Sequence, residues 1–330
     1  MIIKKIYDFL NSYAPFTFQE SWDNSGLQIG NLNNKVNKAI LTLDVTLETV
    51  IEAEKLGAQL IISHHPLFFK PLKNIDFSNN LLRIAINNDI SIISNHTPLD
   101  MVPEGVSFSL AKKLNLQNLK VLTPIKDKFF YKLFFNVPIG MENKILNNIF
   151  SEGVGEYIYY KNCAFETFGE GRFLPKDNSR TPHIKSSKPY KEGKLEIIIR
   201  KDRVDWVINK LREIHPYDEL SFDMIEEAIN PLNIGYGVVG DYSSPKKLSL
   251  LLDDMKESLG LSKIRYIGDL KKRIKKVAVV GGSGSSFIKD AVKLSVDLFI
   301  SGDIKYHDAL EYGDKISIID IGHRASEEPV

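Results

Sequence analysis

The sequence predicts an α/β protein that is interrupted by a second, α+β domain. Over residues 1–125, and again from residue 232, short apolar segments alternate with amphipathic ones, which predicts a mostly parallel sheet with right-handed crossovers. Between them, residues 126–231 follow a β-α-β, β-α-β order, which is typical of a ferredoxin-like plait. We therefore predict a metal-binding α/β domain in two parts, residues 1–125 and 232–330, and an inserted domain over residues 126–231.

The composition is that of an ordinary globular protein. The chain has 330 residues, a formal net charge of +1 and a single cysteine, Cys163. The low net charge does not favour nucleic acid or an anionic membrane as a partner. One cysteine excludes an intrachain disulfide and a cysteine-based zinc site. No apolar run reaches the length of a membrane span, and the N-terminus has a helical pattern of charges. We expect a cytoplasmic protein.

The first predicted elements are a helix and a loop. Ile3, Ile6, Leu10 and Tyr13 share one helical face, which ends before Pro15. Residues 21–30 are rich in Asn, Asp and Gly and predict a loop. This loop either buries Trp22 in a core or lines a pocket.

Three strand–helix units follow the loop. Strands are predicted at residues 38–43, 58–62 and 90–93, and helices after the capping residue Thr46 and at residues 81–86. In a parallel sheet, the carboxyl ends of the strands are where ligands usually bind. The residues at these ends are Asp44, His64 with His65, and His96 with Asp100.

The inserted domain and the second part of the first domain are predicted from the same patterns. The insertion has strands at 130–137, 195–199 and 220–225, an extended segment at 153–168, helices at 142–150 and 202–214, and a mobile polar loop at 169–192. His215 follows the second helix in a turn. The later part has helices at 245–259 and 287–294 and strands at 276–280, 298–300 and 316–319. The glycine-rich segment 281–286 is either a phosphate cradle or a tight strand–helix turn.

Five side chains at or after strand ends form a candidate metal site. His323 and Glu327 are four residues apart, so both project from one face if a helix begins after Gly322. Three imidazoles and two carboxylates suit zinc, manganese, iron, cobalt or nickel and exceed the needs of one catalytic zinc ion. We predict two divalent ions, bridged by a carboxylate and a hydroxide. The proposed ligands are His64, His65, Asp100, His323 and Glu327.

Several of these residues have simpler alternatives. A carboxylate after a strand can cap the next helix, or it can hold a ligating histidine in place. These alternatives apply to Asp44 and Asp303, whereas Asp100 is either a ligand or a cap for a helix at 104–114. His96 and His307 are each an acid–base residue, a residue that supports a metal ligand or a surface histidine, and His96 is the candidate catalytic proton carrier.

Six short segments carry a resemblance to a known family. They are Trp22–Leu27, Leu43–Thr46, Ser63–Pro66, Asn95–Asp100, Ser301–Asp303 and Gly322–Glu327. Together they resemble the GTP cyclohydrolase I type 2 homologue family, the Ngg-interacting-factor-like dinuclear metal-centre proteins, over nearly the whole chain. Residues from Phe130 to about Glu227 are similar to the CutA/PII-like domain that many bacterial members carry.

The resemblance implies a three-layer α/β metal-binding domain with two similar halves, the same five ligands, and a toroidal homohexamer. It also implies a metal-dependent hydrolase that opens the ring of GTP with a metal-activated water. The alternatives are a phosphoesterase and a metal-binding regulatory or scaffold protein without turnover. Since helix ends fray and the sequence stops at Val330, we expect the position of Glu327 to depend on burial of that end.

Overall fold

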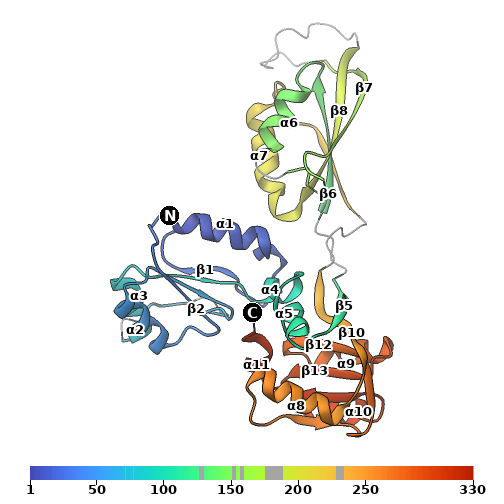
Figure 1. Ribbon diagram of the computed structural model, residues 1–330. Helices are drawn as coiled ribbons and strands as arrows, with labels where there is room; N and C mark the ends of the chain where they lie inside the picture. Colours follow the sequence, from blue (N-terminus) through green and yellow to red (C-terminus); the bar gives the residue numbers. More distant parts are fainter. Residues whose placement is uncertain are drawn as a thin grey trace. The chain divides into compact units, whose positions relative to one another are not determined.

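The computed structural model describes residues 1–70, 72–76, 78–125, 130–150, 154–156, 160–174, 189–227 and 234–329. The chain forms two compact units, one of residues 1–125 with 233–330 and one of residues 126–232. The predicted domain boundary at 231/232 and most of the predicted mobile loop lie outside the described residues. Both units combine helices with sheets, so the predicted α/β class is confirmed (Figure 1).

The first half of the larger unit is a four-stranded sheet with helices. Its elements are α1 (Ile3–Tyr13), β1 (Gly26–Ile29), β2 (Ala39–Thr42), α2 (Leu47–Leu56), β3 (Leu60–Ser63), α3 (Asn80–Asn87), β4 (Ser91–Ser94) and α4 (Thr97–Met101). The strand order is β1-β4-β3-β2. Strands β2, β3 and β4 are parallel, and β1 is antiparallel to β4. The parallel strands begin and end in register, so their carboxyl ends share one edge of the sheet.

The second half is a six-stranded mixed sheet. Its elements are α5 (Val106–Lys113), β5 (Gln117–Pro124), β10 (Gly235–Lys247), α8 (Leu248–Leu259), β11 (Arg265–Ile267), β12 (Arg273–Ser283), α9 (Ile288–Lys293), β13 (Leu298–Gly302), α10 (Tyr306–Tyr312), β14 (Ser317–Asp320) and α11 (His323–Glu327). The strand order is β11-β14-β13-β12-β10-β5. Strands β12, β13 and β14 are parallel.

The two halves repeat one topology, as the resemblance implies. In each half a helix (α1 or α8) and a short strand (β1 or β11) precede three parallel strands. The short strand pairs antiparallel with the last of the three. A five-residue helix, α4 or α11, then leaves the last strand. The repeat gives the unit two sheet edges at which polar side chains follow parallel strands.

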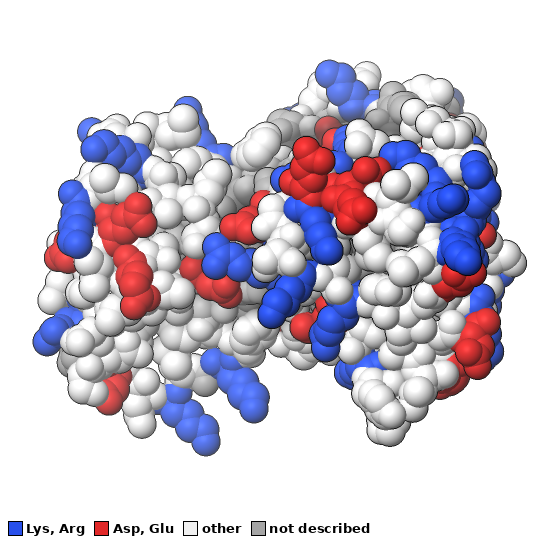
Figure 2. Space-filling view, turned by 60° about the horizontal axis from the view of Figure 1, so that its bottom comes forward, with Lys and Arg blue, Asp and Glu red and all other residues white. Residues whose placement is uncertain are grey.

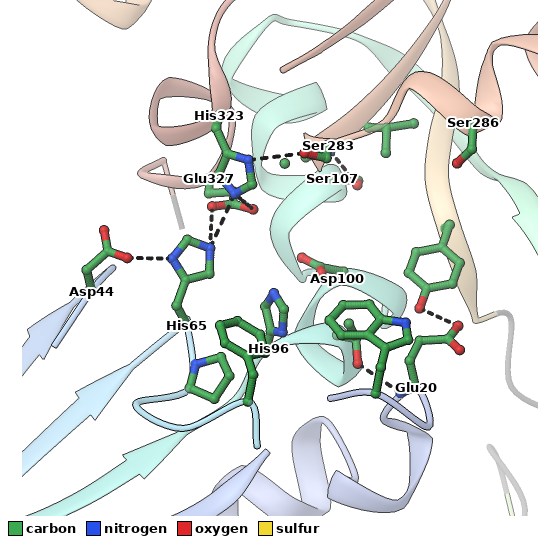
Figure 3. Close-up of a pocket in the computed structure, with 18 of the residues that line it drawn as sticks. Glu20, Asp44, His65, His96, Asp100, Ser107, Ser283, Ser286, His323 and Glu327 are labelled. Atoms are coloured by element: carbon green, nitrogen blue, oxygen red, sulfur yellow. Dashed lines mark hydrogen bonds and ion pairs between the residues drawn. The ribbon is translucent and has the colours of Figure 1, made fainter. Parts of the chain in front are cut away.

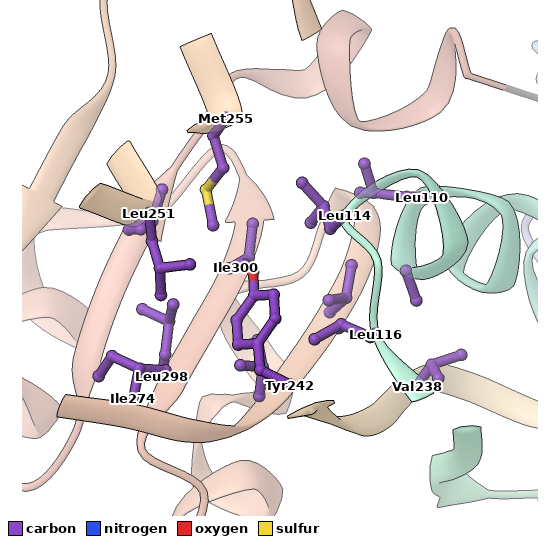
Figure 4. Packing of buried hydrophobic residues seen from close by; sticks show 14 of the residues in the cluster. Leu110, Leu114, Leu116, Val238, Tyr242, Leu251, Met255, Ile274, Leu298 and Ile300 are labelled. Atoms are coloured by element: carbon purple, nitrogen blue, oxygen red, sulfur yellow. The ribbon is translucent and has the colours of Figure 1, made fainter. Parts of the chain in front are cut away.

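The core of the second half lies on both faces of its sheet. Leu298 and Ile300 pack in one cluster with α5 and α8, whereas Phe299 packs in another with α9 (Figure 4). The division follows from the alternation of side chains along a strand. Because both faces of the sheet are buried here, residues 298–300 of β13 are all apolar.

The structure differs from the predictions mainly at antiparallel strands. Strands β5, β10 and β11 were not predicted, and residues 245–247, expected to be helical, belong to β10. Strand β10 pairs with β12 across a register shift between Asp241 and Lys246. The Ser243–Pro245 segment within this shift carries none of the β-branched or apolar residues that mark a strand. Gly26–Ile29 and residues 281–283 are also strand residues rather than loop or turn.

The smaller unit contains β6 (Phe130–Pro138), α6 (Glu142–Phe150), β7 (Ala164–Gly171), β8 (Tyr190–Arg200), α7 (Val204–Ile214) and β9 (Phe222–Glu226). Its strands are antiparallel in the order β7-β8-β6-β9. The β-α-β-β-α-β order is that of a ferredoxin-like unit, and the finer likeness to CutA/PII domains stays a prediction. His215 lies in a turn, where its Nδ1 accepts from the backbone N–H of Tyr217.

The surface carries both signs of charge. On the face drawn in Figure 2, acidic and basic side chains both occur across the surface, in keeping with the formal net charge of +1. Among the described residues, every helix is too short or too polar to cross a lipid bilayer.

Candidate metal centre

The five proposed ligands come together at one cavity of the larger unit, and Figure 3 labels four of them. His65, Asp100, His323 and Glu327 line this cavity of about 750 Å³, and His64 lies buried beside them. His64 and His65 follow β3 in the first half, and Asp100 lies in α4. His323 and Glu327 lie in α11 of the second half. The site is therefore assembled from both repeats.

Local structure explains how α11 presents two of these side chains. Gly322 has a φ of 86°, in the region that favours glycine, and α11 begins at His323 directly after β14, as predicted. Gly302 allows β13 to approach the start of this helix, because a Cβ there would lie 2.7 Å from the backbone N of His323. His323 and Glu327 thus face one side, with Nε2 and Oε1 3.2 Å apart.

Glu327 is the residue that joins two groups of donor atoms. One group is His65, His323 and Glu327, and the other is His64, Asp100 and Glu327, each with its donor atoms within 4.8 Å of one another. His65 Nε2 lies 3.1 Å from Glu327 Oε2 and 3.3 Å from His323 Nε2. His64 Nε2 lies 3.5 Å from Asp100 Oδ1 and 3.7 Å from Glu327 Oε1. Glu327 is only 4% exposed.

Each imidazole of the two groups has its Nδ1 beside an acceptor. The pairs are His64 with the Asn95 carbonyl at 3.0 Å, His65 with Asp44 at 2.7 Å and His323 with Asp303 at 2.7 Å. A carbonyl or an ionised carboxylate only accepts, so each Nδ1 carries the proton. When the ring is neutral, Nε2 therefore presents a lone pair to the cavity, as metal-binding histidines do. Asp44 and Asp303 therefore hold these histidines, and the N-cap of α2 is Thr46.

Unpartnered polar atoms test whether these residues fit a metal ion. His64 Nε2, Asp100 Oδ1 and Glu327 Oε2 are buried and make no hydrogen bond within the part of the chain that the structure describes. Leaving such an atom unpaired costs about 1–3 kcal/mol. A divalent cation among these atoms would satisfy all three, so the residues fit a metal ion.

The charges of the site also favour a cation. The hydrogen bond to Glu327 outweighs burial and raises the pKa of His323 to about 9. Glu327 likewise raises the pKa of His65. Burial opposes a charge on His64, but Asp100 and Glu327 together raise its pKa. Burial raises the pKa of Asp100 to about 6. Glu327 itself is buried, yet its three imidazole neighbours lower its pKa.

His96 lies beside the cluster and is held by an aspartate that the sequence analysis missed. Its Nδ1 donates to Asp23 Oδ1 at 2.9 Å, and Asp23 Oδ2 also accepts from the backbone N–H and the hydroxyl of Thr97. These bonds outweigh burial and hold the pKa of Asp23 at about 2. His96 and its neighbours His64 and His65 have ring nitrogens within 4.8 Å of one another. The one sequence signal for Asp23 was its place in the turn after Trp22.

The remaining predicted site residues lie as follows. Trp22 lines the cavity with 56% of its surface exposed, so its alternative role in a core is wrong. Asp100 does not cap the helix that follows, because it lies within α4 and the N-cap of α5 is Gly105. His307 is exposed on α10, where its ring packs against Tyr306 outside the cavity.

The glycine-rich segment after β12 lines the cavity but offers few donors to a phosphate. The backbone N–H groups of Gly281, Gly282 and Gly284 already donate to the hydroxyls of Ser107, Ser326 and Ser301. These bonds fasten the end of β12 to α5, α11 and β13. Residues 281–283 therefore form the fastened end of a strand, and the turn that the sequence offered as the alternative to a phosphate cradle comes only after them.

Comparisons with known proteins identify the family. The family model for Duf34/NIF3 (NGG1p interacting factor 3) matches residues 1–330. The chain is 33% identical to the GTP cyclohydrolase 1 type 2 homolog of Staphylococcus aureus (strain MRSA252) over 330 residues, which cover 98% of this chain and 89% of the relative. The same name belongs to a Staphylococcus epidermidis relative that is 33% identical over 329 residues, with the same coverage.

Solved structures agree with this assignment. A Bacillus cereus protein related to NIF3 has a TM-score of 0.81 at 32% identity, and the match covers 99% of this chain and 89% of that one. The Staphylococcus aureus protein SA1388 has a TM-score of 0.73 at 31% identity over 99% and 88% of the two chains. The chain therefore belongs to the DUF34/NIF3 family.

Proposed function

We propose that this protein is a hydrolase that works with two divalent metal ions. The observation that carries the proposal is that two groups of donor atoms share the buried Glu327. His64 and Asp100 would complete one ion site, and His65 and His323 the other. The donor set suits zinc, manganese, iron, cobalt or nickel. Two such ions, when bound, supply a water of lowered pKa and polarise the substrate.

The residues around the cluster position its ligands and move a proton. Asp44, Asp303 and the Asn95 carbonyl fix three imidazoles with Nε2 toward the cavity. Asp23 accepts from Nδ1 of His96 and so fixes this ring in the same way. His96 would therefore transfer a proton between its Nε2 and the substrate as a general acid or base.

The substrate proposed first is GTP, opened by hydrolysis at C8 of its guanine ring. The names of the relatives support it, since they are GTP cyclohydrolase 1 type 2 homologs. The alternative phosphoesterase is less favoured, because the hydrogen bonds of Gly281, Gly282 and Gly284 leave their N–H groups unavailable to a phosphate.

Metal content and turnover, measured on the same preparation, test the proposal. We expect close to two zinc, manganese, iron, cobalt or nickel ions per chain and release of formate from GTP. His64→Ala should remove one ion and turnover, whereas His307→Ala, which changes an exposed histidine on α10, should keep both. Two bound ions with no turnover of GTP or of phosphoesters would favour the metal-binding regulatory alternative. Fewer than one ion after saturation with each metal would refute the dinuclear site.

We also propose that the protein assembles as a homohexamer. The resemblance to the family supports this proposal. Size-exclusion chromatography with light scattering should give about six times the chain mass of 37.4 kDa. A monomer or dimer at micromolar concentration would contradict it.

A further inference from the structure

Two large aromatic side chains form a wall of the cavity next to the metal cluster. Trp22 and Phe69 are 56% and 51% exposed, although both line the cavity. Their ring centroids lie 6.4 Å apart with the planes 29° from parallel. The ring centroid of His96 lies 5.7 Å from that of Trp22 and 5.8 Å from that of Phe69, and its plane is 75° and 77° from theirs. Exposed aromatic surface beside a reactive group is typical of a site that binds a ligand.

Hydrogen bonds hold the two loops of this wall together. Asn24 Nδ2 donates to the carbonyl of Phe68 at 2.6 Å, and the N–H of Phe68 donates to Gln28 Oε1 at 3.3 Å. Asn24 Nδ2 also donates to Gln28 Oε1. The loop that carries Trp22 is thereby fastened to the loop that carries Phe69. A wall that is ordered before binding loses less entropy when a flat ring stacks on it.

The same cavity contains a pair of hydrogen-bond acceptors. The hydroxyl of Tyr236 donates to Glu20 Oε1 at 2.8 Å, and both side chains line the cavity with His96. Glu20 and His96 are labelled in Figure 3. Burial and the charge of Glu20 raise the pKa of Tyr236, so this hydroxyl keeps its proton. Because that proton is already shared with Glu20, the pair offers acceptor oxygens to a ligand and no free donor.

We propose that the aromatic wall and the Glu20–Tyr236 pair form a base-binding subsite. Trp22 and Phe69 would stack on a planar ring, and Glu20 would accept from neighbouring N–H groups at the edge of that ring. Guanine presents such an edge, with a ring N–H beside an amino group. Adenine has an unprotonated ring nitrogen at the equivalent place, which would face the carboxylate unfavourably. The inference rests on the proposed function in one respect, since it assigns the substrate class of that same cavity.

Fluorescence of Trp22 gives a direct test. The chain has two tryptophans, so Trp206→Phe, a change in α7, leaves Trp22 as the sole reporter. In zinc-loaded protein we expect guanosine to quench Trp22 saturably and ribose to leave it unchanged. Guanosine is the probe because it has no phosphate to bind the metal ions. Phe69→Ala should weaken guanosine binding, and Phe9→Ala, which removes an exposed ring of α1, should not.

Glu20→Gln tests whether the subsite prefers guanine to adenine. This variant keeps an acceptor for the hydroxyl of Tyr236. We expect about a tenfold to hundredfold weaker affinity for guanosine and little change for adenosine, since a hydrogen bond to a charged group is lost. Glu52→Gln, at an exposed position of α2, is the matched control. Equal losses for both nucleosides, or no saturable quenching by guanosine, would overturn the inference.

The outcomes separate this inference from the proposed function. Guanosine binding that persists in a protein without turnover would support the subsite while the hydrolase proposal fails. If the protein instead turns over a substrate without an aromatic ring, such as glycerol phosphate, and does not bind guanosine, the hydrolase proposal is supported and the subsite is refuted.

Discussion

Asp44→Ala should weaken one of two metal-binding events and leave the other intact. Asp44 accepts from His65 Nδ1 at 2.7 Å, and His65 belongs to only one of the two donor groups. Without this acceptor, the His65 ring can rotate or carry its proton on Nε2. His64, in the other group, is held by a backbone carbonyl that the substitution does not change.

The size of the effect follows from the exposure of the pair. Loss of an acceptor behind a metal-binding histidine typically costs a factor of about 10–100 in affinity. The Asp44 side chain is 58% exposed, so solvent screens its charge and we expect the lower part of that range. For the same reason, the free energy of unfolding of metal-free protein should change by less than about 1 kcal/mol.

Isothermal titration calorimetry measures both zinc-binding events when zinc is added to protein from which a chelator has removed the metal. Asp303→Ala should weaken the same event, because Asp303 holds His323 of the same group. Asp253→Ala, an exposed substitution in α8, controls for the loss of one negative charge. The reasoning would be refuted if Asp44→Ala bound zinc at both sites within twofold of the affinity of the starting protein. It would also be refuted if both affinities fell equally.

Three other predictions follow from the described contacts. Glu327→Gln should reduce the metal content from about two ions to less than one, measured by elemental analysis, because both groups lose the ligand they share. His215 is neutral in the fold, since Nε2 donates to the Asn136 carbonyl and Nδ1 accepts from Tyr217, and burial lowers its pKa below the usual 6.5. The unfolded chain therefore binds a proton more readily, so stability should fall as the pH drops below about 6.5. His215→Gln should flatten this dependence in urea unfolding between pH 7 and pH 5, and an unchanged slope would contradict the assignment. Phe299→Ala should cost about 3–5 kcal/mol of unfolding free energy, because Phe299 is fully buried in β13. A loss below 1 kcal/mol would mean that the core refills the space.

The strands and helices of the parallel repeats were largely predictable. A strand such as β13, buried on both faces, gives a continuous apolar run, and the helix before it has apolar residues on one face. Strand β10 was not predictable in the same way, because its partners β5 and β12 lie far away in the sequence. Its antiparallel hydrogen bonds stabilise residues such as Ser243 and Pro245 that have no local preference for a strand.

The sequence by itself determined the α/β class, the strand ends at which the proposed ligands lie, and the spacing of His323 and Glu327 on one helical face. These are local features, because the periods of strands and helices decide them over a few residues. Only the tertiary structure decided that His65 and His323, 258 positions apart, lie within reach of one ion. It also decided that Asp23 holds His96 and that Glu20 meets Tyr236. Such pairs depend on how the two repeats and their loops pack, and no local pattern records that packing.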